Sequence, residues 1–337
     1  RIVMCIGVIA ASWVPTAANA AQPISVGVLH RADFAYAEMM EFAFSMALEE
    51  INTAGGVKGR PLALSFADDQ GTPGAGVQAV KALIRQERAV LLVGGYSSSN
   101  TLQMAFAADG MDTPFLVCTA ADDHITQHNL ANVFRLNPPA CEYTKALEAL
   151  LLERIKPQSI SIVYENSPYG TGGARRMMAF CRANEIDLRG IHPYFKDAAS
   201  AGYIERVMSP IRDNPPEVIF MVSYLKDAVL LTRKAKEMQL GALLAGGAGG
   251  FTHEAFSRLA GPASENLVTA TLWSPSAKNA LAGPFRDAYV DRFAIEPDYH
   301  AAEAYSALFV AADALKRAAT LTAADVRLAL KDTRLMT

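Results

Sequence analysis

Residues 24–66 contain a strand–helix–strand pattern from which the architecture of the chain can be inferred. The pattern begins with ISVGVL at 24–29, a short apolar run rich in β-branched residues. The segment 38–52 repeats apolar residues at helical spacing and stops before Gly55 and Gly56, which are typical of the end of a helix. A second apolar run, PLALSF at 61–66, follows. This order predicts a parallel β–α–β unit.

The same alternation continues along the chain. Strands are predicted at 89–93 and 114–119, with helices at 76–86 and 101–109. A second set then begins with a predicted helix at 141–154, and its predicted strands cover 159–164, 187–192, 217–222, 242–245 and 266–272. Strands that alternate with helices indicate parallel sheets covered on both faces. The sequence therefore predicts an α/β fold with two doubly wound, Rossmann-like lobes.

Two extended, proline-containing segments, 132–139 and 268–275, are predicted to bridge the lobes. The helices expected from residue 280 onward should pack back on the first lobe. We therefore expect a discontinuous N-terminal lobe (21–135 and 273–337) and a C-terminal lobe (136–272), joined by a multi-strand hinge.

The composition excludes several classes of protein. The 337 residues are 51% hydrophobic and 19% charged, which fits a folded chain with a large core rather than a disordered one. A net charge of −3 gives no electrostatic footprint for nucleic acid or for an anionic membrane surface. The 4 cysteines form no CxxC pattern, so no structural zinc site is expected.

The first 20 residues have the pattern of a secretory signal. Arg1 precedes an apolar run at 2–14, Pro15 ends that run, and Ala18 and Ala20 provide small residues before a cleavage point. The run is too short to span a bilayer. We expect cleavage after Ala20 and export to the periplasm.

Motifs for common enzyme chemistries are absent from the sequence. The loop at 30–36 lacks GxGxxG, and the chain has no GxxxxGK[ST], GxSxG or HExxH sequence. His124 and His128, beside Asp122 and Asp123, have a spacing that allows a metal site, but solvated histidines are the favoured interpretation. We expect no enzymatic activity, no catalytic residue, no cofactor and no metal.

Candidate binding residues lie in the loops that follow strands, where open α/β sheets bind their ligands. The sequence VGGYSSSNT at 93–101 runs from a strand through a glycine turn into a cluster of hydroxyls at a helix start. Such a loop suits an anion such as a carboxylate, although plain helix capping by serine explains the same pattern. The loops CTAAD at 118–122, YENSPYG at 164–170 and VSY at 222–224 also follow strands.

Three stretches resemble a known family: ISVGV at 24–28, ALEEINTAGGVKGRPL at 47–62 and FADD at 66–69. They are similar to the periplasmic solute-binding proteins of ABC transporters, in the leucine/isoleucine/valine-binding class with the type I fold. The resemblance runs from about Pro23 to the C-terminus, and IN at 51–52 with GGVKG at 55–59 is its most characteristic part. Members of that class usually continue beyond the counterpart of Thr337, through a third crossing segment.

The resemblance implies two lobes that close on a small ligand. In the first lobe it places an aromatic cover at Tyr36, a carboxylate-binding loop at Ser97, Ser98 and Ser99, and a loop of backbone groups at Thr119, Ala120 and Ala121, with Asp122 beside it. In the second lobe it places ring cover at Tyr169 and Tyr224, and Ser223 lies in the same loop as Tyr224.

Two departures from the family pattern bear on the ligand. Amino-acid binders carry an acidic residue for the ligand ammonium near position 248, where this chain has Ala248 within GGAGG. Either Asp122 or Glu165 substitutes for it, or the ligand has no α-amino group, because an unpaired buried ammonium is costly. Arg31 replaces a small residue and either pairs with a carboxylate or faces solvent. Both departures favour a carboxylic acid over a simple branched-chain amino acid.

The expected function is that of the solute-binding component of an ABC importer. It would bind a small carboxylate, an amino acid or an aromatic or aliphatic acid, between the lobes. Its partners would be that ligand and an inner-membrane ABC permease, with no nucleic acid, and the protein would be mostly monomeric. The alternative is a soluble ligand sensor of the same fold that feeds a regulator or receptor.

Overall fold

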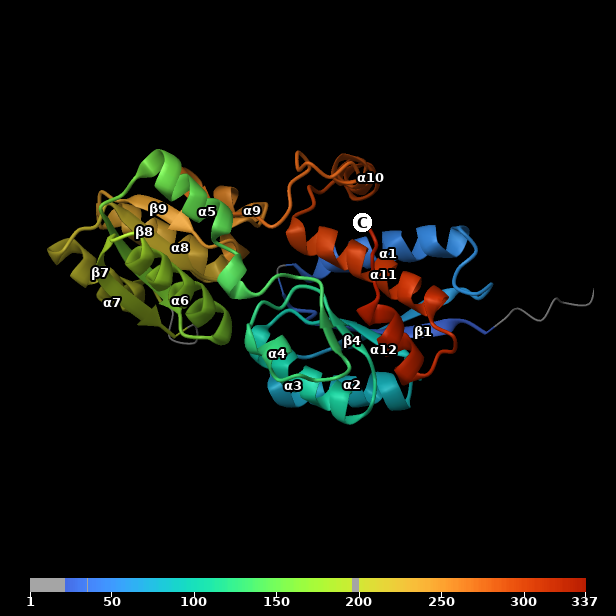
Figure 1. Cartoon of the computed structure of the whole chain (residues 1–337). Coiled ribbons are helices and arrows are strands. Elements are labelled where there is room, and N and C mark those ends of the chain that lie inside the picture. The colour runs from blue at the N-terminus through green and yellow to red at the C-terminus, as the bar shows by residue number, and fades with distance from the viewer. Residues whose placement is uncertain (1–21, 35, 196–199) are drawn as a thin grey trace, which may run out of the picture.

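The computed structural model describes residues 22–34, 36–195 and 200–337. The predicted signal at 1–20 lies outside these residues. The described chain forms two parallel five-stranded sheets, each covered by helices on both faces (Figure 1). We call each sheet with its helices a lobe. The predicted fold class, two doubly wound α/β lobes, is confirmed.

The first sheet has the strand order β2-β1-β3-β4-β5. Its strands are β1 (Ile24–His30), β2 (Leu62–Asp68), β3 (Leu91–Gly94), β4 (Phe115–Val117) and β5 (Val133–Arg135). All pair in parallel, with Val28 of β1 opposite Phe66 on one side and Val93 on the other. Because the strands are parallel, their carboxyl ends meet at one edge of the sheet.

Helices from distant parts of the sequence cover the two faces of this sheet. One face packs against α1 (Ala37–Thr53), α10 (Ala282–Phe293), α11 (Tyr299–Arg317) and α12 (Ala323–Lys331). The other face packs against α2 (Pro73–Arg85) and α3 (Ser98–Gly110). The last three helices thus belong to the core of the first lobe, and α11 lies along α1 (Figure 1).

The characteristic IN…GGVKG stretch has a structural role at the end of α1. The Asn52 side chain donates to the Leu62 oxygen at 3.0 Å and accepts from the Leu62 N–H at 2.8 Å. Gly55 and Gly56 reverse the chain with φ of 96° and 69°, and a Cβ on Gly56 would collide with the Arg60 oxygen. The motif therefore fixes the start of β2 against the end of the helix.

The second sheet has the order β10-β9-β8-β6-β7. Its strands are β6 (Ser159–Glu165), β7 (Asp187–Tyr194), β8 (Val218–Val222), β9 (Leu243–Gly246) and β10 (Val268–Thr269). One face packs against α5 (Lys145–Leu150) and α6 (Pro168–Ala183). The other packs against α7 (Ala201–Asp213), α8 (Leu225–Glu237) and α9 (Ala255–Ala260).

Two predicted elements differ in detail. Of the strand expected at 266–272, only Val268–Thr269 forms a strand, because the chain then leaves the sheet for the first lobe. The helix expected at 141–154 is a 3₁₀ turn (Ala140–Glu142), the α5 segment and a π-helical end (Leu151–Ile155). The short α4 (His124–Gln127) was not predicted.

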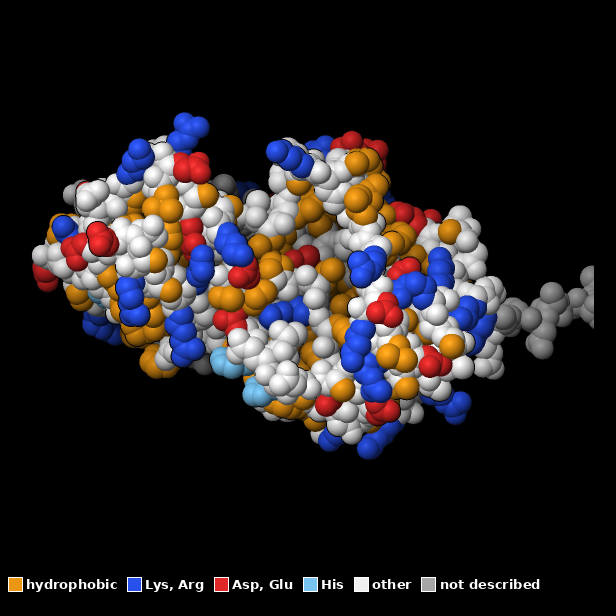
Figure 2. Space-filling model, viewed as in Figure 1, with side chains coloured by type: hydrophobic (Ala, Val, Ile, Leu, Met, Phe, Trp, Pro, Cys, Tyr) orange, Lys and Arg blue, Asp and Glu red, His pale blue; other side chains and the backbone are white. Residues whose placement is uncertain are grey.

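The described chain passes between the lobes through 136–139 and again through 270–281. Beside these crossings, a groove of ≈ 660 Å³ lies between α1, α10 and α11, with Trp273, Phe285 and Tyr305 in its walls. Hydrophobic side chains gather in the hollow between the lobes and beneath α10 (Figure 2). None of the described helices is both long and apolar enough to cross a membrane.

Candidate functional site

The loop after β3 is held against its neighbours by glycine geometry. Gly94 has φ of 113°, and a Cβ there would collide with the Leu29 oxygen of β1. Thr119, after β4, donates its hydroxyl to the Gly95 oxygen at 2.9 Å. The Asp122 N–H donates to the Ser98 Oγ at 3.1 Å. These bonds join the loops after β3 and β4 into one wall at the carboxyl edge of the first sheet.

This wall faces the second lobe across a closed interface. A cavity of ≈ 10 Å³, about the space of one water molecule, remains between them. Its lining residues are Tyr96, Ser98, Thr119, Ala121, Tyr143, Tyr169, Tyr224, Gly249, Tyr299 and His300. None of these described residues is a carboxylate, a lysine or an arginine. The interface is therefore sealed by the protein's own phenol and imidazole rings.

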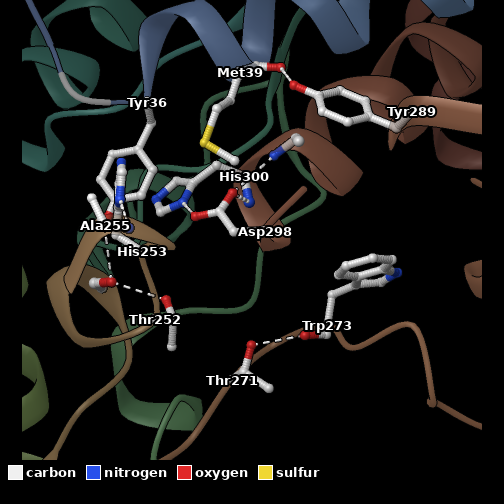
Figure 3. Close-up of polar contacts among 12 residues, drawn as sticks. Tyr36, Met39, Thr252, His253, Ala255, Thr271, Trp273, Tyr289, Asp298 and His300 are labelled. Atoms are coloured by element: carbon white, nitrogen blue, oxygen red, sulfur yellow. Dashed lines mark hydrogen bonds and ion pairs between the residues drawn. The ribbon is translucent and has the colours of Figure 1, made fainter. Parts of the chain in front are cut away.

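Tyr36, just before α1, is at the centre of the ring cluster. Its ring centroid lies 3.8 Å from that of His300 and 5.9 Å from that of Tyr96, both in the first lobe. It also lies 4.5 Å from the ring of His253 in the second lobe (Figure 3). Tyr96 in turn lies 5.4 Å from Tyr224 of the second lobe. Aromatic contacts of this kind give the two lobes a common apolar interface.

Two of the buried tyrosine hydroxyls are hydrogen-bonded to backbone oxygens of the second lobe. The Tyr36 hydroxyl donates to the Gly249 oxygen at 3.1 Å, and the Tyr169 hydroxyl donates to the Gly247 oxygen at 3.0 Å. Burial raises the pKa of Tyr36, Tyr169 and Tyr224. Hydrogen bonds from the Ser98 N–H and hydroxyl to the Tyr224 phenol oppose the rise in its pKa. The Tyr224 phenol thus contacts the start of α3, where we expect a ligand carboxylate to bind.

A buried histidine–aspartate pair stands at the start of α11. Asp298 accepts from the His300 N–H at 2.9 Å through Oδ1, and its Oδ2 lies 2.8 Å from His300 Nδ1 (Figure 3). The two side chains are 5% and 2% exposed, so water screens the pair little. The pair presents an imidazole of fixed orientation to the cavity.

The structure brings many of the predicted binding residues together. Five line the cavity: Ser98, Thr119, Ala121, Tyr169 and Tyr224. Tyr36 is buried beside them. Arg31 and Ser97 line a larger groove, of ≈ 710 Å³, on one side of the interlobe contact. Arg31 is ion-paired with Asp33 there, at 2.6 Å between Nε and Oδ1.

The remaining predicted residues line neither space. The Ser99 Oγ lies 3.3 Å from the Ser97 Oγ, and Ala120 packs into the core beneath α3. Ser223 accepts from the Tyr194 hydroxyl at 2.8 Å. Ala248 is buried in the second lobe with φ of 56°.

The two acids considered as ammonium partners are placed differently. Asp122 directs Oδ1 to the His124 ring at 2.9 Å, away from the cavity lining. Glu165 ends β6, is 1% exposed, and lines the larger groove with Arg31, Lys226 and Asp227. That groove therefore carries charges of both signs, whereas the lining of the small cavity contains no carboxylate, lysine or arginine.

Sequence reasoning missed half of the cavity lining. Tyr96 lies inside the quoted serine loop, whereas Tyr143, Gly249, Tyr299 and His300 were not singled out. Tyr299 and His300 begin a helix more than 160 residues after the first sheet ends, so a rule that inspects loops after strands passes over them. Asp298 is a typical helix-capping residue, and it could have indicated that a helix starts at Tyr299.

The described part of the chain contains neither a cluster of metal-ligating side chains nor a thiol of lowered pKa. No group of three or more metal-ligating side chains occurs there. Cys118, Cys141 and Cys181 are free thiols, and burial raises the pKa of Cys181 to about 11, so it stays protonated near neutral pH.

Comparisons with known proteins agree on one family. A family model described as "Periplasmic binding protein" matches residues 23–337. Two relatives from Brucella abortus are each 26% identical. The Leu/Ile/Val-binding protein homolog 7 matches over 57% of this chain and 49% of its own length. Homolog 8 matches over 75% and 65%. The chain thus spans about half to two thirds of the length of these relatives.

Solved structures show the same fold. The branched-chain amino acid transporter substrate binding protein from Streptococcus pneumoniae, in complex with isoleucine, is 20% identical with a TM-score of 0.82. The match covers 93% of this chain and 88% of that one. A solute binding protein from R. palustris, in complex with benzoate, is 19% identical with a TM-score of 0.82, over 93% and 86% of the two chains.

Proposed function

The chain belongs to the periplasmic binding protein family, and from that premise we propose that it binds a small carboxylate between its lobes for delivery to an ABC permease. The observation that carries the proposal is the composition of the cavity wall. Ser98, at the start of α3, and Thr119 supply polar groups, and phenol rings supply apolar cover. A helix start with its unpaired N–H groups favours an anion.

The absence of a carboxylate from the described lining residues favours an acid without an ammonium group. A leucine zwitterion in this cavity would bury its ammonium with no carboxylate in the wall. Such burial costs several kcal/mol unless the charge is paired. Relatives of the fold bind both kinds of ligand, since isoleucine and benzoate are the ligands named for the two solved proteins.

Binding requires the lobes to separate and close again. A space of ≈ 10 Å³ accepts no organic acid, so Tyr36 and Tyr224 must withdraw from their partners in the opposite lobe. A ligand that contacts both walls then favours a closed state by its extra contacts. The rings that fill the cleft in this structure would cover the ligand in the closed complex.

A thermal-shift panel tests the proposal. Leucine is compared with 4-methyl-2-oxopentanoate, which has the same carbon skeleton without the ammonium, and benzoate is compared with phenylalanine. Tight binding raises the melting temperature by mass action. We expect the two acids to shift the melting temperature at least as far as the amino acids. A shift by the zwitterions alone would contradict the assignment of the ligand class.

The importer role and the sensor alternative are separated in cells. Deleting the gene should abolish uptake of the labelled acid if the protein serves a permease. If it is instead a soluble sensor, uptake should persist while the transcriptional response to the acid is lost. The family match and the predicted export signal favour the importer.

A further inference from the structure

Two Asp-x-His segments in this chain form the same local bond pattern in different surroundings. In Asp122–His124 the histidine N–H donates to the aspartate Oδ1 at 3.1 Å, and its Nδ1 lies 2.9 Å from the same oxygen. In Asp298–His300 the corresponding distances are 2.9 and 2.8 Å, to Oδ1 and Oδ2 respectively. The His124 side chain is 52% exposed, whereas that of His300 is 2% exposed and lines the interlobe cavity.

The Asp298 carboxylate fixes which nitrogen of His300 can meet a ligand. It caps α11 by accepting from the N–H groups of His300 and Ala301, and it also engages Nδ1. Nε2 is then the ring nitrogen left for another partner. Neutral imidazole offers a lone pair at Nε2, and imidazolium offers an N–H donor.

The groups around His300 are three phenol rings, two acids and a second histidine. Tyr36, Tyr96 and Tyr299 pack their rings on it, and burial raises the pKa of all three. Besides Asp298, the nearby acid is Glu303, one turn further along α11, whose pKa burial also raises. His253 lies on the far side of Tyr36, in the second lobe.

We propose that His300, held by Asp298, binds the ligand carboxylate as an imidazolium, so that ligand binding takes up a proton. The proposal rests on the proposed function. A carboxylate in this cavity finds no lysine or arginine among the described lining residues. A cation is the partner that offsets the cost of burying it, and His300 is the lining residue that can become one. An anion at Nε2 stabilises the charged form of the ring.

The sign of the pH dependence follows from this linkage. Because binding takes up a proton, the affinity for the acid falls as the pH rises, by up to about tenfold per pH unit.

Isothermal titration calorimetry tests the proposal with benzoate or 4-methyl-2-oxopentanoate, whichever binds the wild type more tightly. Titrations at pH 6 to 9 in phosphate and in Tris measure the number of protons taken up. The wild type should show uptake and weaker binding at higher pH. His300→Gln keeps an amide donor but does not titrate, so it should bind without proton uptake and with a flat pH profile. Its affinity at pH 6 should be about tenfold weaker.

Three further variants complete the experiment. His124→Gln removes the exposed member of the matched pairs and should behave as the wild type. Glu303→Gln should retain proton uptake, which separates His300 from its acidic neighbour. Asp298→Asn keeps a capping side chain but removes the negative charge, so the fall in affinity should begin at a lower pH. This variant also tests the proposal if His300→Gln fails to fold.

The outcomes are distinguishable. If neither acid binds the wild type, the proposed function is wrong and the role of His300 fails with it. If an acid binds but His300→Gln keeps the wild-type affinity and proton uptake, the role of His300 alone is wrong. Proton uptake lost in Glu303→Gln and kept in His300→Gln would assign the proton to Glu303 and also overturn the proposal.

Discussion

The Tyr36 hydroxyl of the first lobe donates a hydrogen bond to the Gly249 oxygen of the second lobe, with 3.1 Å between the two oxygen atoms. The donor precedes α1, and the acceptor follows β9, 213 residues later in the chain. Both groups are buried, so the bond exists when the lobes are together and is exchanged for water when they part. The bond therefore stabilises the closed arrangement of the two lobes.

Tyr36→Phe should shift the protein toward a more open state. The variant keeps the ring contacts with His300 and His253 and removes the hydroxyl alone. A hydrogen bond of this type contributes about 0.5–1.5 kcal/mol to the closed state. Small-angle X-ray scattering without added ligand should give a larger radius of gyration than the wild type. Tyr305→Phe, which removes a hydroxyl bound to Glu50 within the first lobe, is the control. Equal radii for all three proteins would contradict the prediction.

Ser98→Ala should weaken binding of the acid. The Ser98 hydroxyl lines the cavity at the start of α3 and would meet a charged oxygen of the ligand. Loss of a hydrogen bond to a charged group costs about 1–3 kcal/mol of binding free energy. Calorimetry at constant pH measures the change. Ser45→Ala, in an exposed turn of α1 where the hydroxyl donates to the Phe42 oxygen, should leave the affinity unchanged. Unaltered affinity in Ser98→Ala would remove the serine loop from the site.

The fold could be predicted from the sequence because local signals and global architecture agree. Val26 and Val28 pack on one face of the first sheet and Leu29 packs on the other, as expected for a covered strand. The Gly55-Gly56 turn ends α1 where the helical pattern ends. The family resemblance is confirmed by the match over residues 23–337. Strand lengths near the crossing segments were harder to predict, since β10 ends at Thr269, where the chain leaves the second sheet for the first lobe.

The site could be predicted only in part, because some of its residues follow strands and others are brought in by the packing of a distant helix. Ser98, Thr119 and Tyr169 follow strands and could be found by topology alone. His300 and Tyr299 reach the cavity because α11 packs along α1, a contact between segments about 250 residues apart. No periodicity or turn signal in one segment encodes such a contact. The reversal at 248–249 likewise depends on positive φ at Ala248, which a sequence pattern does not predict.

Glu303→Gln should stabilise the protein at high pH. The Glu303 Oε2 is buried without a hydrogen-bond partner, and burial raises the pKa of the carboxyl group in the folded state. A raised folded pKa means that stability is lost as the pH rises from the unfolded value, about 4.3, toward the folded one, by up to about 1.4 kcal/mol per pH unit. Urea unfolding should show a variant more stable than the wild type at pH 8 and similar to it at pH 4.

A second glutamate checks the sign of this effect. Arg286 lowers the pKa of Glu296, so the folded-state charge of that residue is favourable. Glu296→Gln should therefore give no gain in stability at pH 8. A gain in both variants would show that the loss of negative charge in general, and not the burial of Glu303, is responsible.

Gly249→Ala should block the cleft at its centre. Gly249 has φ of 52°, and a Cβ there would collide with the Tyr169 hydroxyl, which lines the same cavity. Gly241, with φ of 69°, has no atom within 4 Å of a Cβ and serves as a matched control. In both variants the left-handed backbone costs the alanine about 1–2 kcal/mol. Urea unfolding should therefore show that each variant loses at least this much stability. Gly241→Ala should keep the wild-type affinity for the acid, whereas Gly249→Ala displaces Tyr169 and should bind at least tenfold more weakly. Because the two variants share the backbone strain and only one collides with Tyr169, the difference in affinity would report on the cavity itself. Equal affinities would show that the ligand does not occupy it.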